Sequence, residues 1–274
     1  MKIKEVTGTL YRNLGLRIVN TLARRGDYQL RRNIDYGDEV RNRLDYYLAQ
    51  GNPDRPTVLF FYGGNWRSGE KADYRFVADT LACNGFNVII PDYRLYPEVR
   101  FSTIQEDAVN ATKWALENLP KTQKLYLMGH SAGAQLGALI CLNDSLLQCG
   151  SESTRPIHGF IGLAGPYDFF PFTEDDHWDL FSPEERYAES QPVNYVSANA
   201  PPMYLLHGHE DMRVRRGHSR SLMEKIQAAG GDAKREVYAN TDHIGILLSF
   251  TQLHRRSSPV VKDVVEFLSD TGTM

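Results

Sequence analysis

The chain has 274 residues, of which 42% are hydrophobic and 24% are charged, and its formal net charge at pH 7 is −3. This length suffices for one α/β domain, and the composition is typical of a folded globular protein rather than a disordered or membrane-spanning one. The small negative charge excludes the broad basic surface that would attract nucleic acid or an anionic membrane.

The cysteines and the apolar runs bear on the cellular compartment. Cys83, Cys141 and Cys149 form an odd set in a chain too large to need disulfides, which favours free thiols in a reducing compartment. No secretory signal follows Met1, and the longest apolar runs are far too short to cross a bilayer. We therefore expect a cytoplasmic protein with no membrane or nucleic-acid partner, and we leave a homodimer open.

The predicted elements alternate between apolar strands and amphipathic helices. Residues 1–30 are expected to form an N-terminal helical segment, because apolar residues recur there at four-residue spacing. Strands are expected at 43–48, 57–61, 87–90, 124–128, 157–163, 203–207 and 235–238. Helices are expected at 70–83, 104–119, 132–142, 218–229 and 260–268. This order predicts an α/β fold, a single domain over 1–274 whose mostly parallel sheet has helices on both faces.

Residues 165–201 interrupt this alternation. The segment is rich in proline and aromatic residues and contains the acidic run Glu174-Asp175-Asp176. We expect a small cap insertion between two strands that forms a wall of a pocket.

The pentapeptide Gly129-His130-Ser131-Ala132-Gly133 is a G-x-S-x-G sequence. It follows an apolar strand and opens a helix, which is the setting of a nucleophile elbow. A sharp turn at this point requires glycine at both outer positions, because side chains there would collide with neighbouring strands. We predict that Ser131 is a nucleophile. The structural alternative is a glycine-rich loop with a capping serine.

A serine hydroxyl becomes a strong nucleophile only beside a base that an acid orients. Asp211 and His243 each follow a predicted strand, and they come after the serine in the order acid, then histidine, that such hydrolases use. Glu210 and Asp242 are rival acids, although Asp242 is too close in sequence to orient its neighbour easily. No metal-ligand spacing is present, so no metal is expected. The remaining histidines are interpreted as loop or packing residues: His130, His158, His177, His207, His209, His218 and His254.

A glycine pair follows the strand at 57–61, within Tyr62-Gly63-Gly64-Asn65-Trp66. Glycines let the backbone turn its N–H groups toward the negative oxygen of a tetrahedral intermediate. We predict an oxyanion hole formed by the N–H groups of Gly64, Asn65 and Ala132. A simple glycine turn is the alternative.

Several aromatic residues fall in loops that are predicted to reach this site. They would suit short or aromatic acyl or alcohol groups better than long chains. The alternative for each is that it anchors its loop to the core. The predicted pocket residues are Tyr62, Trp66, Tyr93, Tyr167 and Phe169.

Taken together, these motifs resemble esterases related to hormone-sensitive lipase, especially the carboxylesterase and kynurenine-formamidase-like branch. Tyr62 departs from this family, which has histidine at that position of its His-Gly-Gly-x-Trp motif. The change bears on the pocket wall rather than on the backbone amides. The segments that resemble family motifs are 62–66, 91–95, 105–107, 129–133, 165–168 and 208–214.

The resemblance implies an α/β-hydrolase fold and a serine carboxylesterase that needs no cofactor. Its substrate would be a small-molecule ester or amide, cleaved through an acyl-enzyme. Two alternatives remain open: an arylformamidase that hydrolyses N-formylkynurenine, and a non-catalytic ligand-binding protein of the same fold.

Overall fold

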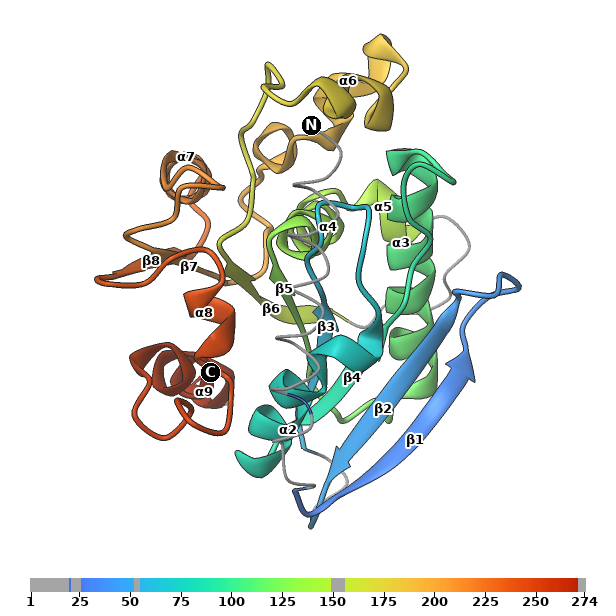
Figure 1. Cartoon of the computed structure of the whole chain (residues 1–274), viewed down its shortest axis with the longest axis vertical. Helices are drawn as coiled ribbons and strands as arrows, with labels where there is room; N and C mark the ends of the chain where they lie inside the picture. Colours follow the sequence, from blue (N-terminus) through green and yellow to red (C-terminus); the bar gives the residue numbers. More distant parts are fainter. Residues whose placement is uncertain (1–19, 21–25, 52–54, 149–155, 271–274) are drawn as a thin grey trace, which may run out of the picture.

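The computed structural model describes residues 20, 26–51, 55–148 and 156–270. Its centre is an eight-stranded sheet with the order β1-β2-β4-β3-β5-β6-β7-β8 (Figure 1). The strands are β1 (Tyr28–Asp35), β2 (Arg43–Ala49), β3 (Thr57–Phe61), β4 (Asn87–Pro91), β5 (Leu125–His130), β6 (Ile157–Leu163), β7 (Met203–Gly208) and β8 (Ala233–Tyr238). Strands β3 to β8 run parallel, and β1 and β2 are antiparallel at one edge. The mostly parallel sheet is therefore confirmed.

The inner strands are buried on both faces, as their sequences require. Every residue of β3, β4 and β5 is buried, and continuous apolar runs of this kind are typical of parallel strands covered by helices. The strand β1 was not predicted. Its residues are half-buried or exposed at the sheet edge, and three consecutive positions are exposed, so it lacks such a run.

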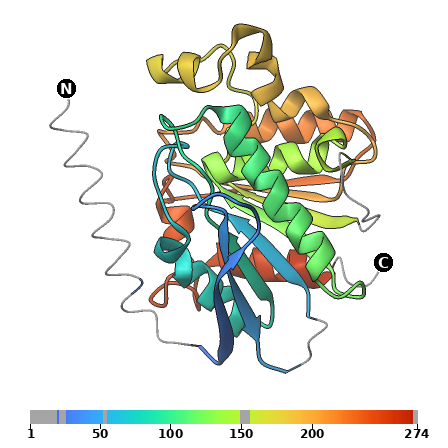
Figure 2. The same ribbon diagram turned by 90° about the vertical axis from the view of Figure 1, so that its right-hand side faces the viewer.

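Helices cover both faces of the sheet. In Figures 1 and 2, α3, α4 and α7 lie on one face, and α2 and α9 lie on the other. Residues 70–83, predicted as one helix, divide into a 3-10 turn and α2. The helices are η1 (Lys71–Tyr74), α2 (Arg75–Cys83), α3 (Phe101–Asn118), α4 (Ala132–Leu142), α5 (Ser145–Gln148), α6 (Asp175–Leu180), η2 (Glu184–Ser190), η3 (Pro192–Tyr195), α7 (Gly217–Ala228), α8 (Gly245–Leu248) and α9 (Pro259–Asp270).

The segment between β6 and β7 carries α6, η2 and η3 and lies at the top of the molecule in Figure 1. It is joined to α4 by Gln135, whose Nε2 donates to the carbonyl oxygen of Ser190 at 2.7 Å. Every residue of α4 is buried, because this helix is enclosed by the sheet, by α3 and by this segment.

The predicted N-terminal helical segment lies outside the described residues, apart from Asn20 and the start of β1. The side chain of Asn20 bonds to the backbone of Asp73 and Phe76. Within the described ranges, no helix combines the length and the hydropathy needed to cross a bilayer.

Candidate active site

Ser131 lies at the tip of a tight turn between β5 and α4. Its φ of 55° and ψ of −122° are a strained backbone conformation for a residue with a side chain. A Cβ on Gly129 would lie 2.3 Å from the carbonyl oxygen of Gly133, and one on Gly133 would lie 2.1 Å from that of Phe61. Both glycines are therefore required by the turn. The Ser131 N–H donates to the Leu163 carbonyl at 2.9 Å, which attaches the turn to β6.

Three side chains from separate loops form one hydrogen-bonded chain. The Oγ of Ser131 lies 3.0 Å from Nε2 of His243, and Nδ1 of His243 lies 2.8 Å from Oδ2 of Asp211. Ser131 follows β5, Asp211 follows β7 and His243 follows β8, so all three lie at the carboxyl ends of parallel strands. With Nδ1 donating to the carboxylate, Nε2 presents a lone pair to the hydroxyl, as a general base must.

The Asp211 carboxylate is buried and accepts hydrogen bonds on both oxygens. Its Oδ1 accepts the N–H groups of Arg213 and Val214, each at 2.9 Å. Its Oδ2 lies 2.8 Å from His243 and 3.3 Å from Nε2 of His207. Burial alone would raise the pKa of this carboxyl, but the hydrogen bonds from His207 and then His243 outweigh burial and lower the pKa well below its ordinary value. Asp211 is therefore charged at any working pH.

His130 contacts both the backbone and the ring of His243. Its Nε2 lies 2.9 Å from the carbonyl oxygen of His243, and the two ring centroids are 4.9 Å apart. Burial, followed by the charge of His243, lowers the pKa of His130 to about 3. His130 is therefore neutral, and its Nε2–H donates to the backbone of His243.

This neutral histidine makes stability depend on pH. Because the pKa of His130 is about 3 in the folded protein and about 6.5 in an unfolded chain, the unfolded state binds the extra proton between these values. We expect the free energy of unfolding to fall as the pH drops from 6.5 toward 3, with His130 contributing about 1.4 kcal/mol per pH unit near pH 5. Urea unfolding at several pH values measures this slope.

The variant His130→Asn should show a shallower acid slope, whereas Ser269→Ala, which changes an exposed and non-titrating side chain on α9, should keep the wild-type slope. Comparing slopes removes any constant loss of stability in either variant. Equal slopes in His130→Asn and the wild type would contradict this account.

The backbone after β3 forms a tight loop, residues 62–70, that we call the oxyanion loop. Gly64, Asn65 and Trp66 have φ values of 147°, 54° and 57°, and a Cβ on Gly64 would lie 1.8 Å from the carbonyl oxygen of Ser68. Gly64 and Asn65 line the same pocket as Ser131. Among the described residues, none accepts a hydrogen bond from the N–H of Asn65 or of Ala132. These N–H groups are thus available for a bound oxygen.

The pocket has a volume of about 870 Å³ and contains Ser131 and His243 in its lining. Two of the predicted aromatic residues, Trp66 and Phe169, form part of its wall. Their ring centroids are 6.1 Å apart with 23° between the planes. The indole N–H of Trp66 donates to Gln135 at 3.0 Å, so this wall is fixed to α4.

The prediction that Tyr62, Tyr93 and Tyr167 line the pocket is wrong. All three side chains are almost completely buried, and none belongs to the pocket wall. The Tyr93 hydroxyl donates to the Tyr62 carbonyl, and the Tyr167 ring packs against Gly162 and Gly165. A phenol with an internal acceptor can be buried without loss, as Tyr62 and Tyr93 are. The buried Tyr167 hydroxyl has no hydrogen-bond partner among the described residues. All three rings pack in the core rather than line the pocket.

Sequence reasoning missed other residues of this site. His207 was interpreted as a loop or core residue, yet it contacts Asp211, and its spacing of four residues from this acid was the available signal. Residues beside the triad in sequence also form the pocket wall. Those that were not predicted are Met212, Val214, Ile244, Leu247 and Leu248, and His177 on α6 was missed as well.

Across the residues that the structure describes, no three His, Cys, Asp or Glu side chains are grouped so that they could hold an ion.

Comparison with known proteins relates this geometry to a family. Residues 44–226 match the BD-FAE family model. The isoprenylcysteine alpha-carbonyl methylesterase ICME of Arabidopsis thaliana is 30% identical over 247 residues, which cover 80% of this chain. The chain spans 58% of the length of that relative. A kynurenine formamidase of Danio rerio is 25% identical, covering 78% of this chain and 74% of its own length.

Solved structures agree on the fold. Esterase B from Lactobacillus rhamnosis superposes with a TM-score of 0.79 at 17% identity, covering 98% of this chain and 94% of that one. At this identity the likeness shows the fold alone, and it confirms the α/β-hydrolase architecture.

Proposed function

The chain belongs to the BD-FAE family, and from this premise we propose that it is a serine hydrolase that cleaves carboxylic esters. The observation that carries the proposal is the hydrogen-bonded chain from Ser131 through His243 to Asp211, with the serine and the histidine in the lining of one pocket. A non-catalytic binding protein of the same fold would not need these three side chains to be joined by hydrogen bonds.

In the proposed mechanism the Oγ of Ser131 attacks the ester carbonyl carbon while its proton moves to Nε2 of His243. The carbonyl oxygen becomes negative and accepts hydrogen bonds from the N–H groups of Gly64, Asn65 and Ala132. When the C–O bond breaks, the imidazolium gives its proton to the departing alkoxide, and the alcohol leaves.

The acyl group then remains bound to Ser131 as an ester. A water molecule attacks it, His243 takes the proton of this water, and the carboxylic acid is released as Ser131 regains its hydrogen. Asp211 stays charged throughout, because its pKa lies well below the ordinary range. It holds the imidazole in the required tautomer and stabilises its protonated form.

Two observations bear on the substrate. The relative ICME is named a methylesterase, which supports an ester with a small alcohol. The near-parallel rings of Trp66 and Phe169 in the pocket wall support a short or aromatic acyl group, since flat rings pack well on such groups.

A panel of nitrophenyl esters tests this preference. We expect kcat/KM to be highest for acetyl, butyryl and benzoyl esters and to fall about tenfold or more by the dodecanoyl ester, because the longer chain must leave the aromatic walls. Highest activity on the longest acyl chain would contradict the proposed selectivity.

An arylformamidase is the second candidate, and it is favoured by the match to a kynurenine formamidase. With the same three residues in the same roles, the Oγ of Ser131 would attack the formyl carbonyl of N-formylkynurenine, and an amine would leave instead of an alcohol. Assay of this compound beside the ester panel separates the two, because kcat/KM for the physiological class should exceed the other by orders of magnitude.

We also propose a cytoplasmic location, which fits the free thiols of Cys83 and Cys141 among the described residues. Fractionation of cells that express the tagged chain tests this location.

A further inference from the structure

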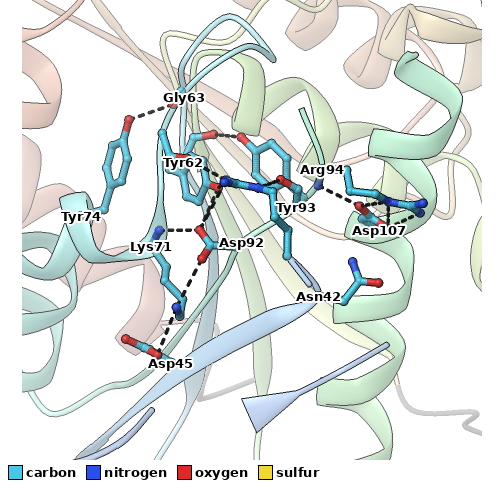
Figure 3. A network of polar contacts seen from close by, with 12 residues as sticks. Asn42, Asp45, Tyr62, Gly63, Lys71, Tyr74, Asp92, Tyr93, Arg94 and Asp107 are labelled. Carbon is cyan, nitrogen blue, oxygen red and sulfur yellow. Dashed lines mark hydrogen bonds and ion pairs between the residues drawn. The ribbon is translucent and has the colours of Figure 1, made fainter. Parts of the chain in front are cut away.

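The oxyanion loop begins at a tyrosine that a substrate cannot reach. Tyr62 is fully buried, and its ring stacks between those of Tyr74 and Tyr93, with centroids 5.0 and 4.6 Å away. The Tyr93 hydroxyl donates to the carbonyl oxygen of Tyr62 at 2.6 Å, and the Tyr74 hydroxyl donates to that of Gly63 at 2.8 Å. Figure 3 shows these rings holding the first two residues of the loop by their backbone.

Asp92, which directly follows β4, connects the two ends of the loop. Its Oδ1 accepts hydrogen bonds from the Tyr62 hydroxyl at 3.0 Å and from the backbone N–H of Lys71 at 2.6 Å. Lys71 is the first residue after the loop, so a single carboxylate oxygen closes it (Figure 3). The other oxygen lies 3.3 Å from Nζ of Lys71, which is also 3.7 Å from Asp45 on β2.

Arg41, in the turn before β2, makes a second connection. One Nη atom donates to the Tyr62 hydroxyl at 3.1 Å and to the carbonyl oxygen of Gly69 at 2.8 Å. Its Nε donates to the carbonyl oxygen of Tyr93 at 2.7 Å. Arg41 therefore also contacts both the beginning and the end of the oxyanion loop.

The charged groups of this network are paired, and its phenol carries a proton that it can donate. Two cations, Arg41 and Lys71, face two carboxylates, Asp45 and Asp92, so the partly buried charges are balanced. Burial, and then the charge of Asp92, raises the pKa of Tyr62 well above its ordinary value. The phenol is therefore protonated and donates to the carboxylate.

We propose that Tyr62, Asp92 and Arg41 are positioning residues for the oxyanion hole. By joining both ends of the loop, they fix the direction of the N–H groups of Gly64 and Asn65. The inference rests on the proposed hydrolase function. It means that Tyr62 does not contact the substrate but holds the oxyanion loop in place from the protein core.

The physical reason is that an oxyanion hole works only when its donors already point at the position that the negative oxygen will occupy. A displacement of about 1 Å can cost about 100-fold in rate. Gly64 has no Cβ, and Asn65 and Trp66 hold an unfavourable left-handed backbone, so the loop needs such external support.

The test compares Tyr62→Phe and Asp92→Asn with Tyr238→Phe. Phenylalanine at 62 keeps the stacked ring and removes only the hydroxyl. Tyr238→Phe is the matched control, because it also removes a buried phenol that donates to a carboxylate, here Asp263 at 2.6 Å. Activities are normalised to the active sites that a fluorophosphonate titrates.

We expect Tyr62→Phe to lower kcat by about 10- to 100-fold with KM within about twofold of the wild type. An aryl trifluoromethyl ketone, which forms a charged tetrahedral adduct with the serine, should bind more weakly by the same factor. Tyr238→Phe should change neither quantity, even if its melting temperature falls. A purely structural role for Tyr62 would lower the melting temperature and leave kcat per titrated site unchanged, which would overturn the proposal.

Hydrogen exchange supplies a readout that does not depend on turnover. Backbone amides of residues 62–70 should exchange at least about tenfold faster in Tyr62→Phe, while those of β7 should be unchanged. Unchanged exchange in the loop would overturn the proposal, even if Asp92→Asn failed to fold. A wild-type chain that is not labelled by the fluorophosphonate would instead contradict the hydrolase function, so the two failures can be told apart.

Discussion

Replacing Ser131 with alanine is expected to lower kcat for ester hydrolysis by about 10⁶-fold, which is the effect of removing the nucleophile from a serine hydrolase of this type. The substitution removes one oxygen atom, the one that lies 3.0 Å from Nε2 of His243. It leaves the turn intact, since alanine tolerates the same φ of 55° about as well as serine does. Folding should therefore be preserved, and KM should change little.

Labelling by a fluorophosphonate probe tests the reactivity of the Ser131 Oγ and does not require the natural substrate to be known. It should label the wild type and Ser269→Ala, an exposed serine on α9, and it should not label Ser131→Ala. If Ser131→Ala retained more than about 1% of the wild-type kcat, another residue would have to be the nucleophile.

Replacing Asp211 with asparagine is expected to lower kcat by about 10⁴-fold, because the variant imposes the wrong tautomer on His243. The N–H groups of Arg213 and Val214 both point at Oδ1, so the amide oxygen of asparagine must take that position. Its NH₂ group then faces Nδ1 of His243, which must present a lone pair. The imidazole proton moves to Nε2, which can no longer accept the serine proton.

The matched control is Asp242→Asn, one residue before the histidine. Asp242 is an exposed carboxylate that accepts the N–H groups of Ile244 and Gly245, and asparagine can replace it in this bond. We expect kcat to stay within about threefold of the wild type. The reverse result, with Asp242→Asn inactive and Asp211→Asn active, would show that the wrong acid has been assigned.

The turn at Ser131 could be predicted because its chemistry restricts neighbouring residues in sequence. Positions 129 and 133 require glycine, because a Cβ at either would lie only 2.1 to 2.3 Å from a backbone oxygen, and an apolar strand must come before them. Asp211 and His243 could be predicted because the ends of parallel strands converge. Each of these inferences depends on local pattern and strand order.

The aromatic residues could not be assigned in this way. Tyr62 and Trp66 are four residues apart in one loop, yet Tyr62 is enclosed in the core while Trp66 lines the pocket. The difference depends on acceptors from other elements, Asp92 for the phenol and Gln135 for the indole. Such partners are distant in sequence, so local pattern carries no information about them.

The strand β1 was missed for a related reason. It contacts only one neighbouring strand, and its register with β2 shifts between Arg31 and Ile34. An edge strand with this irregularity has neither a continuous apolar run nor a clean alternation.

The contact between Gly133 and the strand that carries Phe61 has a consequence for how this protein could acquire new substrates. The helix behind the nucleophile abuts the backbone at the start of the oxyanion loop with no room for even one methyl group, so neither can shift without moving the other. Variation is restricted there, whereas Phe169 and Phe170 on the segment between β6 and β7 border the same cavity from outside this rigid contact. Selectivity can therefore diverge among relatives through that segment while the reacting atoms keep their places.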